Sequence, residues 1–111
     1  MTKEQMMTFL LDSWHTQIVF VDTHHVIQYM NAKAMKQYGK WGDLIGKSIF
    51  SCHNENSCKR IKEIFSRLEN GEEEVVYDMN HEKHRVYMRA IRDENGALVG
   101  YFERFEPPIG K

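Results

Sequence analysis

Residues 18–50 constrain the fold most strongly, because two strand-like runs are followed at once by a capped helix. Residues 18–21 read Ile-Val-Phe-Val, residues 26–30 read Val-Ile-Gln-Tyr-Met, and the polar run Thr23-His24-His25 lies between them. Runs rich in β-branched and aromatic residues favour strands, and the polar break favours a turn. Asn31 suits the N-cap of a following helix that ends at Gly39. The segment therefore predicts a β-hairpin that leads directly into a helix.

A helix is also predicted at the N-terminus, over residues 1–15. Residues 2–5, Thr-Lys-Glu-Gln, have the form of a capping box. Apolar side chains then recur at helical spacing along one face. They are Met6, Met7, Leu10, Leu11 and Trp14. This stripe could cover the domain's own core or a partner, and its richness in methionine and leucine favours a dimer contact.

The second half of the chain predicts one helix and three strands. The helix starts near Asn56 or Ser57, carries an apolar stripe along residues 61–68 and stops at Asn70-Gly71. Strands are expected over residues 74–79, 85–92 and 97–105, with a turn at residues 93–96 joining the last two. We therefore expect an α+β domain with a five-stranded antiparallel sheet and helices on one face.

Composition places the chain among globular domains. Its 111 residues are 41% hydrophobic and 28% charged, which fits one domain with a packed core. A formal net charge of -1 provides no broad positive field for nucleic acid or anionic lipid. The N-terminus does not read as a signal peptide, and no apolar run is long enough to cross a bilayer. These features, with only two cysteines, predict a cytoplasmic location and no membrane contact.

The order of the predicted elements carries a motif that resembles the PAS family of sensory domains. The motif is Val21-Asp22-x-x-His25-x-Ile27-x-x-x-Asn31, followed by Gly39 and by residues 44–47, Leu-Ile-Gly-Lys. Residues 46–53, 89–96 and 100–101 resemble a bacterial and archaeal subgroup that has no firmly assigned ligand. The resemblance covers nearly the whole chain. It implies a sheet of strand order 2-1-5-4-3, a PAS-like domain over residues 16–106 and a tail over residues 107–111.

The resemblance also gives roles to the motif residues. Asp22 would close the first hairpin, Asn31 would cap the next helix, and the segment containing Gly46 would lead into helices that wall a central pocket. The family usually has glycine at the position of His25 and alanine at that of Lys33. Histidine is among the residues enriched at positive φ, so His25 can take the turn position, and Ala34 can supply the small residue.

The resemblance implies a module that binds a small apolar ligand or cofactor and signals through its termini and dimer contacts. A ligand-free dimerisation module is the alternative, and neither the output nor the signalling partner can be read from these residues. The family's architecture gives a set of pocket candidates, each of which could equally be ordinary core. They are Phe20, Tyr29, Met35, Tyr38, Ile49, Phe50, His53, Ile61, Phe65, Met88 and Tyr101.

The cofactor cannot be identified from the sequence. His53 lies just before the pocket-wall helix, where some PAS sensors hold heme, so a heme-based gas or redox sensor is one alternative. A light-sensing relative would need a cysteine shortly after Gly46, but Lys47, Ser48 and Ile49 follow and Cys52 comes too late. The residues therefore argue against a flavin photoadduct.

The cysteines and remaining histidines give no strong metal or catalytic signature. Cys52-His53-x4-Cys58 could form a zinc site only with a second pair such as His81 and His84, and this spacing is not a zinc motif. Cys58, near a helix start and two basic residues, could form a redox pair with Cys52, or both thiols could be inert. No phosphate loop or nucleophile elbow is present. We therefore predict no enzyme activity; a Cys/His hydrolase using His53 is the residual alternative.

Overall fold

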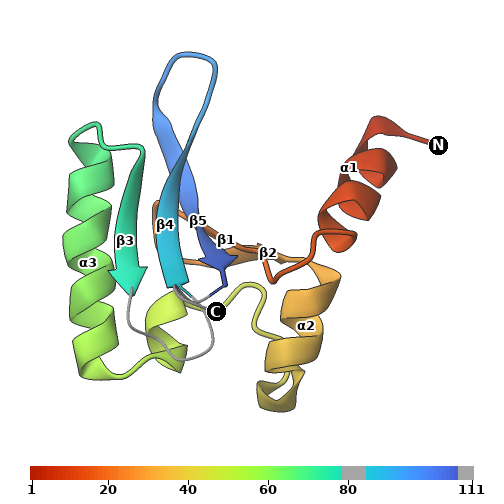
Figure 1. The fold of residues 1–111 in the computed structure, drawn as a ribbon, viewed down its shortest axis with the longest axis horizontal. Coiled ribbons are helices and arrows are strands. Elements are labelled where there is room, and N and C mark those ends of the chain that lie inside the picture. The colour runs from red at the N-terminus through yellow and green to blue at the C-terminus, as the bar shows by residue number, and fades with distance from the viewer. Residues whose placement is uncertain (79–84, 108–111) are drawn as a thin grey trace.

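The computed structural model describes residues 1–78 and 85–107, apart from the side chain of Cys52. Three α-helices, two 3₁₀ helices and five strands follow one another along this part of the chain (Figure 1). They are α1 (Lys3–Asp12), β1 (Val19–Asp22), β2 (Ile27–Met30), α2 (Ala32–Tyr38), η1 (Gly39–Trp41), η2 (Ile49–Cys52), α3 (Glu55–Glu69), β3 (Glu74–Asp78), β4 (Arg85–Arg92) and β5 (Leu98–Glu106). The predicted order of helices and strands is confirmed, whereas Met79, His81 and His84 lie outside the described residues.

The strands form one sheet in the order β2-β1-β5-β4-β3, and neighbouring strands run antiparallel. This confirms the expected fold class and strand order. The last strand, β5, lies between β1 and β4, with Val21 opposite Tyr101 and Asp22 opposite Gly100. A Cβ atom at Gly100 would lie 2.4 Å from both the Phe20 ring and the Val21 carbonyl oxygen. Glycine therefore permits this close pairing of β1 and β5.

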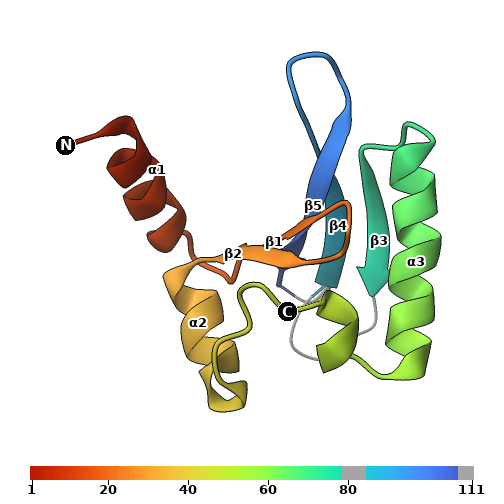
Figure 2. The same cartoon turned by 180° about the vertical axis from the view of Figure 1, so that it is seen from behind.

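Helix α3 packs against β3 and β4, and Figures 1 and 2 show it running alongside β3. Its Ile61, Ile64 and Leu68 are completely buried and share the core with Val75 and Met88. The helix begins earlier than predicted. The Asn54 side chain accepts a hydrogen bond from the Ser57 backbone N–H at 2.8 Å, so Asn54 is the N-cap in place of Asn56 or Ser57.

Helix α2 ends at the predicted glycine, because Gly39 is its C-cap. Gly39 has a φ of −61° and begins η1, and the left-handed turn falls on Gly42, with a φ of 86°. Further along, Gly46 has a φ of 90°, and its N–H donates to the Ile27 carbonyl at 2.7 Å. Ile27 in turn donates to the Lys47 carbonyl at 2.9 Å. These two bonds hold the segment after η1 beside β2.

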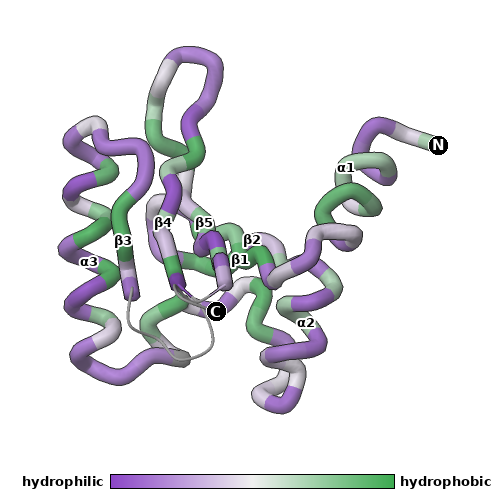
Figure 3. Tube along the Cα trace, in the orientation of Figure 1, coloured by the Kyte–Doolittle hydropathy of each residue, from purple (hydrophilic) through white to green (hydrophobic). Residues whose placement is uncertain are grey.

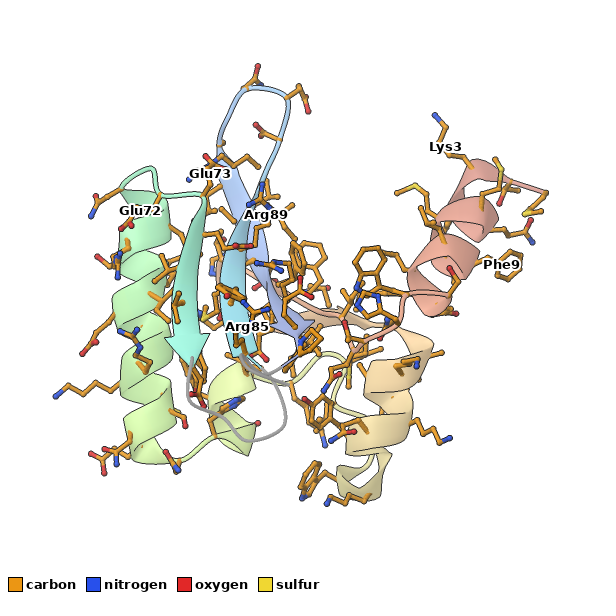
Figure 4. The ribbon with its side chains drawn as sticks, viewed as in Figure 1. Lys3, Phe9, Glu72, Glu73, Arg85 and Arg89 are labelled. Carbon is orange, nitrogen blue, oxygen red and sulfur yellow. The ribbon has the colours of Figure 1, made fainter. Side chains whose placement is uncertain are left out.

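Helix α1 stands away from the sheet in both views (Figures 1 and 2). The predicted capping box is present, because the Gln5 N–H donates to the Thr2 hydroxyl and the Thr2 N–H donates to the Gln5 side chain. No residue of α1 is buried, and Leu10 is 66% exposed. Figure 3 shows the apolar residues along the helix, and Figure 4 shows Phe9 projecting away from the domain. The α1 stripe is therefore not covered by the core of its own chain.

The side chain of Asn31 joins the end of α1 to the sheet and to α2. Its Oδ1 accepts hydrogen bonds from the Ile18 and Ala34 N–H groups, at 2.9 and 3.0 Å. Its Nδ2 donates to the Leu11 and Thr16 carbonyls, at 2.9 and 3.0 Å. Asn31 is completely buried, so this amide satisfies four bonds where water does not reach. The predicted N-cap is confirmed, and the same residue anchors α1.

The turn between β1 and β2 fits the histidine that stands in place of glycine. His25 has a φ of 65°, which confirms the expected left-handed conformation. The Asp22 carboxylate accepts from the His24 and Val26 N–H groups, at 2.8 and 3.0 Å, and closes the turn. The His25 ring packs against Phe50 and Phe65, at centroid distances of 4.8 and 4.6 Å. Its Nδ1 also lies 3.0 Å from the Tyr101 hydroxyl, which ties the turn to β5.

None of the described helices is both long enough and apolar enough to cross a membrane.

Replacing Asn31 with alanine should strongly destabilise the domain. The substitution leaves four backbone groups without their partner, and we expect the free energy of unfolding to fall by about 3 kcal/mol. Asn54→Ala is the matched control, because it removes an exposed N-cap and should cost about 1 kcal/mol. Urea denaturation of both variants tests the difference, and equal losses would contradict the role of Asn31 as a tertiary anchor.

The His25 ring should make stability depend on pH. Burial lowers the pKa of His25, while Asp22 and Glu69 act in the opposite direction. The folded state therefore favours the neutral ring. The stability that the neutral His25 ring contributes is fully present above the pKa of histidine in the unfolded chain, about 6.5. It is lost as the pH falls from that value to the lower pKa of His25 in the folded protein.

We expect His25→Asn, which keeps a residue tolerant of positive φ, to lower the free energy of unfolding by about 2 kcal/mol near neutral pH. The difference from the unsubstituted protein should narrow between about pH 7.5 and pH 5.5. His24→Asn, on the exposed side of the same turn, is the control and should have little effect. Urea denaturation across this range tests the expectation, and a difference of constant size would contradict it.

Candidate ligand pocket

A cavity of about 550 Å³ lies between the β1–β2 end of the sheet, α2 and the segment that runs through η1 and η2. Its wall combines residues from β1, β2, α2, both 3₁₀ helices, their connections and β5. The lining residues are Val19, Ile27, Met30, Tyr38, Trp41, Leu44, Lys47, Ile49, Ser51, His53 and Glu103. This volume is within the range of pockets that bind small organic molecules.

The cavity has an apolar part and a polar part. The apolar residues that line it are buried and belong to the hydrophobic core. They are Val19, Ile27, Met30, Leu44 and Ile49. Trp41, Lys47 and Ser51 are exposed and form its outer edge. The arrangement suits a mostly apolar molecule held in orientation by a few polar groups.

Two titratable side chains, His53 and Glu103, reach the cavity from different elements. The His53 Nδ1 lies 2.9 Å from the Ile49 carbonyl, which fixes the ring at the end of η2. Glu103 comes from β5, where Met88 of β4 lies opposite it. Burial raises the pKa of the Glu103 carboxyl, and a positive charge on His53 acts in the opposite direction. The pocket therefore contains a carboxyl group, that of Glu103, whose protonation depends on its burial and on the charge of His53.

Of the predicted pocket residues, Tyr38, Ile49 and His53 line the cavity. The others lie elsewhere in the fold, and their roles as ligand contacts stay predictions. Ile61 and Met88 are in the core, whereas Phe50, Phe65 and Tyr101 are ring neighbours of His25. Phe20 lies beside Gly100, Tyr29 donates to Asp12, and Met35 is 52% exposed.

Sequence reasoning missed most of the lining, and Glu103 is the most informative omission. Residues 103–106 read Glu-Arg-Phe-Glu, a charged run that suggests an exposed strand end. Tyr101 and Phe105, two positions to either side of Glu103, are both buried. Because alternate strand residues share a face, this alternation was the available signal that Glu103 points inward.

The thiols and the proposed metal ligands do not form a site in the described part of the chain. The Cys58 thiol donates weakly to the Phe50 and His53 carbonyls, at 3.4 and 3.6 Å. His81, His84 and the Cys52 side chain lie outside the described structure. Among the residues that are described, no three His, Cys, Asp or Glu side chains gather as metal ligands would. Redox pairing of the cysteines and heme binding by His53 stay predictions.

Comparison with solved structures shows the same fold in several bacterial proteins. The C-terminal domain of a Streptococcus mutans protein matches with a TM-score of 0.75 and 22% identity, over 96% of this chain and 85% of that one. A PAS domain from Colwellia psychrerythraea matches with a TM-score of 0.68 and 19% identity, over 99% of this chain and 100% of that one. A sensory box sensor histidine kinase from Vibrio cholerae matches with a TM-score of 0.64 and 16% identity, over 93% of this chain and 89% of that one. A search of curated proteins finds no significant match.

The family comparison is decisive because it covers nearly the full length. A family model described as a PAS domain matches residues 7–106, from the middle of α1 to the end of β5. The matched region includes the hairpin, the Asn31 cap and the cavity. The protein belongs to the PAS domain family.

Proposed function

We propose that this PAS domain is a sensory module that binds a small, mostly apolar ligand in its cavity and signals through contacts of α1 with a second copy. PAS domains are typical sensory signal-transduction modules and are generally not enzymes. The observation that carries the proposal is the cavity, whose buried apolar residues meet a few polar groups. This combination is what a small-molecule site requires.

The connection between cavity and α1 supports the signalling part of the proposal. Met30 lines the cavity, and the next residue, Asn31, bonds to the Leu11 carbonyl at the end of α1. The Asp12 carboxylate also accepts from the Ala32 N–H at 2.9 Å. A ligand that favours one arrangement of the β2–α2 junction would therefore bias the position of α1. The exposed stripe on α1 would carry that change to a second copy.

Ligand binding can be tested by filling the cavity. Leu44 is buried against the cavity, and Ile45 beside it is 40% exposed. We expect native mass spectrometry of purified protein to show a retained small molecule, lost in Leu44→Trp because indole fills the space, and kept in the control Ile45→Trp. Thermal unfolding of both variants checks that they fold.

The same measurement separates the alternatives. A retained mass with a Soret band, abolished by His53→Ala, would identify a heme sensor. An empty protein, even when expressed in rich medium with heme supplied, would contradict ligand binding and favour an interaction module without a ligand.

Dimerisation through α1 can be tested by charge substitution on its apolar stripe. Leu10 is 66% exposed at the centre of this stripe. If it is buried between two copies, Leu10→Glu should raise the dimer dissociation constant at least about tenfold. Gln5→Glu adds the same charge to the same helix and keeps the capping box, so it should dimerise normally. Analytical ultracentrifugation gives both constants, and a monomeric unsubstituted protein at high micromolar concentration would contradict the proposal.

A further inference from the structure

Glu103 occupies a position in β5 that the fold would otherwise give to an apolar residue. On the same side of the strand, Tyr101 is 1% and Phe105 is 5% exposed. Opposite it on β4, Met88 is completely buried. Glutamate is almost never placed among such neighbours unless a partner compensates its charge.

On the other side of β5, charged residues are paired with residues of opposite charge. Arg104 donates to both carboxylate oxygens of Glu74, at 2.9 Å each, and also pairs with Glu106. The Glu103 carboxyl has no comparable arrangement. Within residues 1–78 and 85–107, no group donates a hydrogen bond to it, and no lysine or arginine forms an ion pair with it. His53 also lines the cavity, and a positive charge on it would lower the pKa of Glu103.

This placement is unfavourable for the folded protein alone. Burial raises the pKa of Glu103, which means that the surroundings do not stabilise the carboxylate. An apolar side chain of similar size would pack in the same place without that cost. Among the described residues, Glu103 has no hydrogen-bond donor and no lysine or arginine partner, and His53 is the side chain that offsets its burial. A carboxyl in this position, facing a cavity, is therefore best explained by an occupant of the cavity.

We propose that the ligand is a small, mainly apolar cation whose amine or amidine nitrogen pairs with Glu103. This inference rests on the ligand-binding function proposed above and names the chemical class of the ligand. The carboxylate would attract a cationic nitrogen inside the cavity, where water screens the pair little. A carboxylate or phosphate group there would be repelled. The opposite charge on the wall, Lys47, is exposed at the outer edge, where solvent weakens its effect.

Two aromatic rings that line the cavity suit the same ligand class. Tyr38 and Trp41 stack with their ring centroids 6.1 Å apart, and both line the cavity. Ring faces attract cations, and the Lys40 ammonium already lies 4.4 Å from the centre of the Trp41 ring. These two rings therefore add a second group of cavity-lining residues that attract a cation, besides Glu103.

Three probes of nearly equal shape test the charge preference: benzamidine is a cation, benzamide is neutral and benzoate is an anion. Their binding to ¹⁵N-labelled protein can be followed by amide chemical shifts. We expect benzamidine to bind most tightly and benzoate most weakly, with shift changes around the cavity. Glu103→Gln keeps the shape of the side chain and removes its charge, so it should weaken benzamidine binding about 30-fold and leave benzamide nearly unchanged.

Glu106→Gln is the matched control, because it removes the same charge from the opposite side of the same strand. It should leave the order of the three probes unchanged. Glu103→Gln should unfold at a temperature no lower than the unsubstituted protein, because the change removes a half-buried titratable group. A large drop in that temperature would show instead that Glu103 stabilises the fold, and would overturn the inference.

The inference is also overturned if Glu103→Gln and the unsubstituted protein respond alike to the three probes, including no response from either. The retained molecule keeps this failure separate from failure of the ligand-binding proposal. If native mass spectrometry finds the same neutral or anionic molecule in both proteins, ligand sensing stands and the cationic class is wrong. If the unsubstituted protein retains nothing and binds no probe, both proposals fail.

Discussion

The Asn31 side chain is the interaction on which the arrangement around the pocket depends. One buried amide accepts from the N–H groups at the start of β1 and of α2. It donates to the carbonyl of Leu11 at the end of α1 and to that of Thr16 in the connection to β1. A neutral amide can meet all four needs at once, because it offers two acceptor and two donor sites. No apolar residue could do this, and a carboxylate would place negative oxygens against the Leu11 and Thr16 carbonyls.

The two faces of the sheet differ in polarity, and the cavity lies on the apolar face. On one side, α3 buries aliphatic residues against β3 and β4, while the cavity lies near β1 and β2. On the other side, Arg104 and Glu74 pair where water reaches them. Glu103 is the exception, because it brings a carboxyl to the apolar side. We propose that Glu103, which suits the fold poorly yet borders the cavity, is a position where function outweighs stability.

Much of the fold was predictable because its signals act over a few residues. The Thr2 capping box, the Asn31 cap and the left-handed His25 each depend on bonds or sterics within a short segment. The error at α3 was also local, because its start was predicted near Asn56 or Ser57 whereas Asn54 is the N-cap. Such choices are decided by small energy differences between neighbouring residues.

The sequence by itself determined the order of helices and strands, the family and the apolar stripe on α1, because periodicity, caps and turns depend on residues that are close together in the chain. The tertiary structure decided what lines the cavity. A cavity exists where elements distant in the chain fail to fill the space between them, so no local pattern marks its wall. Only the pairing of β5 with β1 and β4 set Glu103 near His53, and only the packed fold left α1 without a cover.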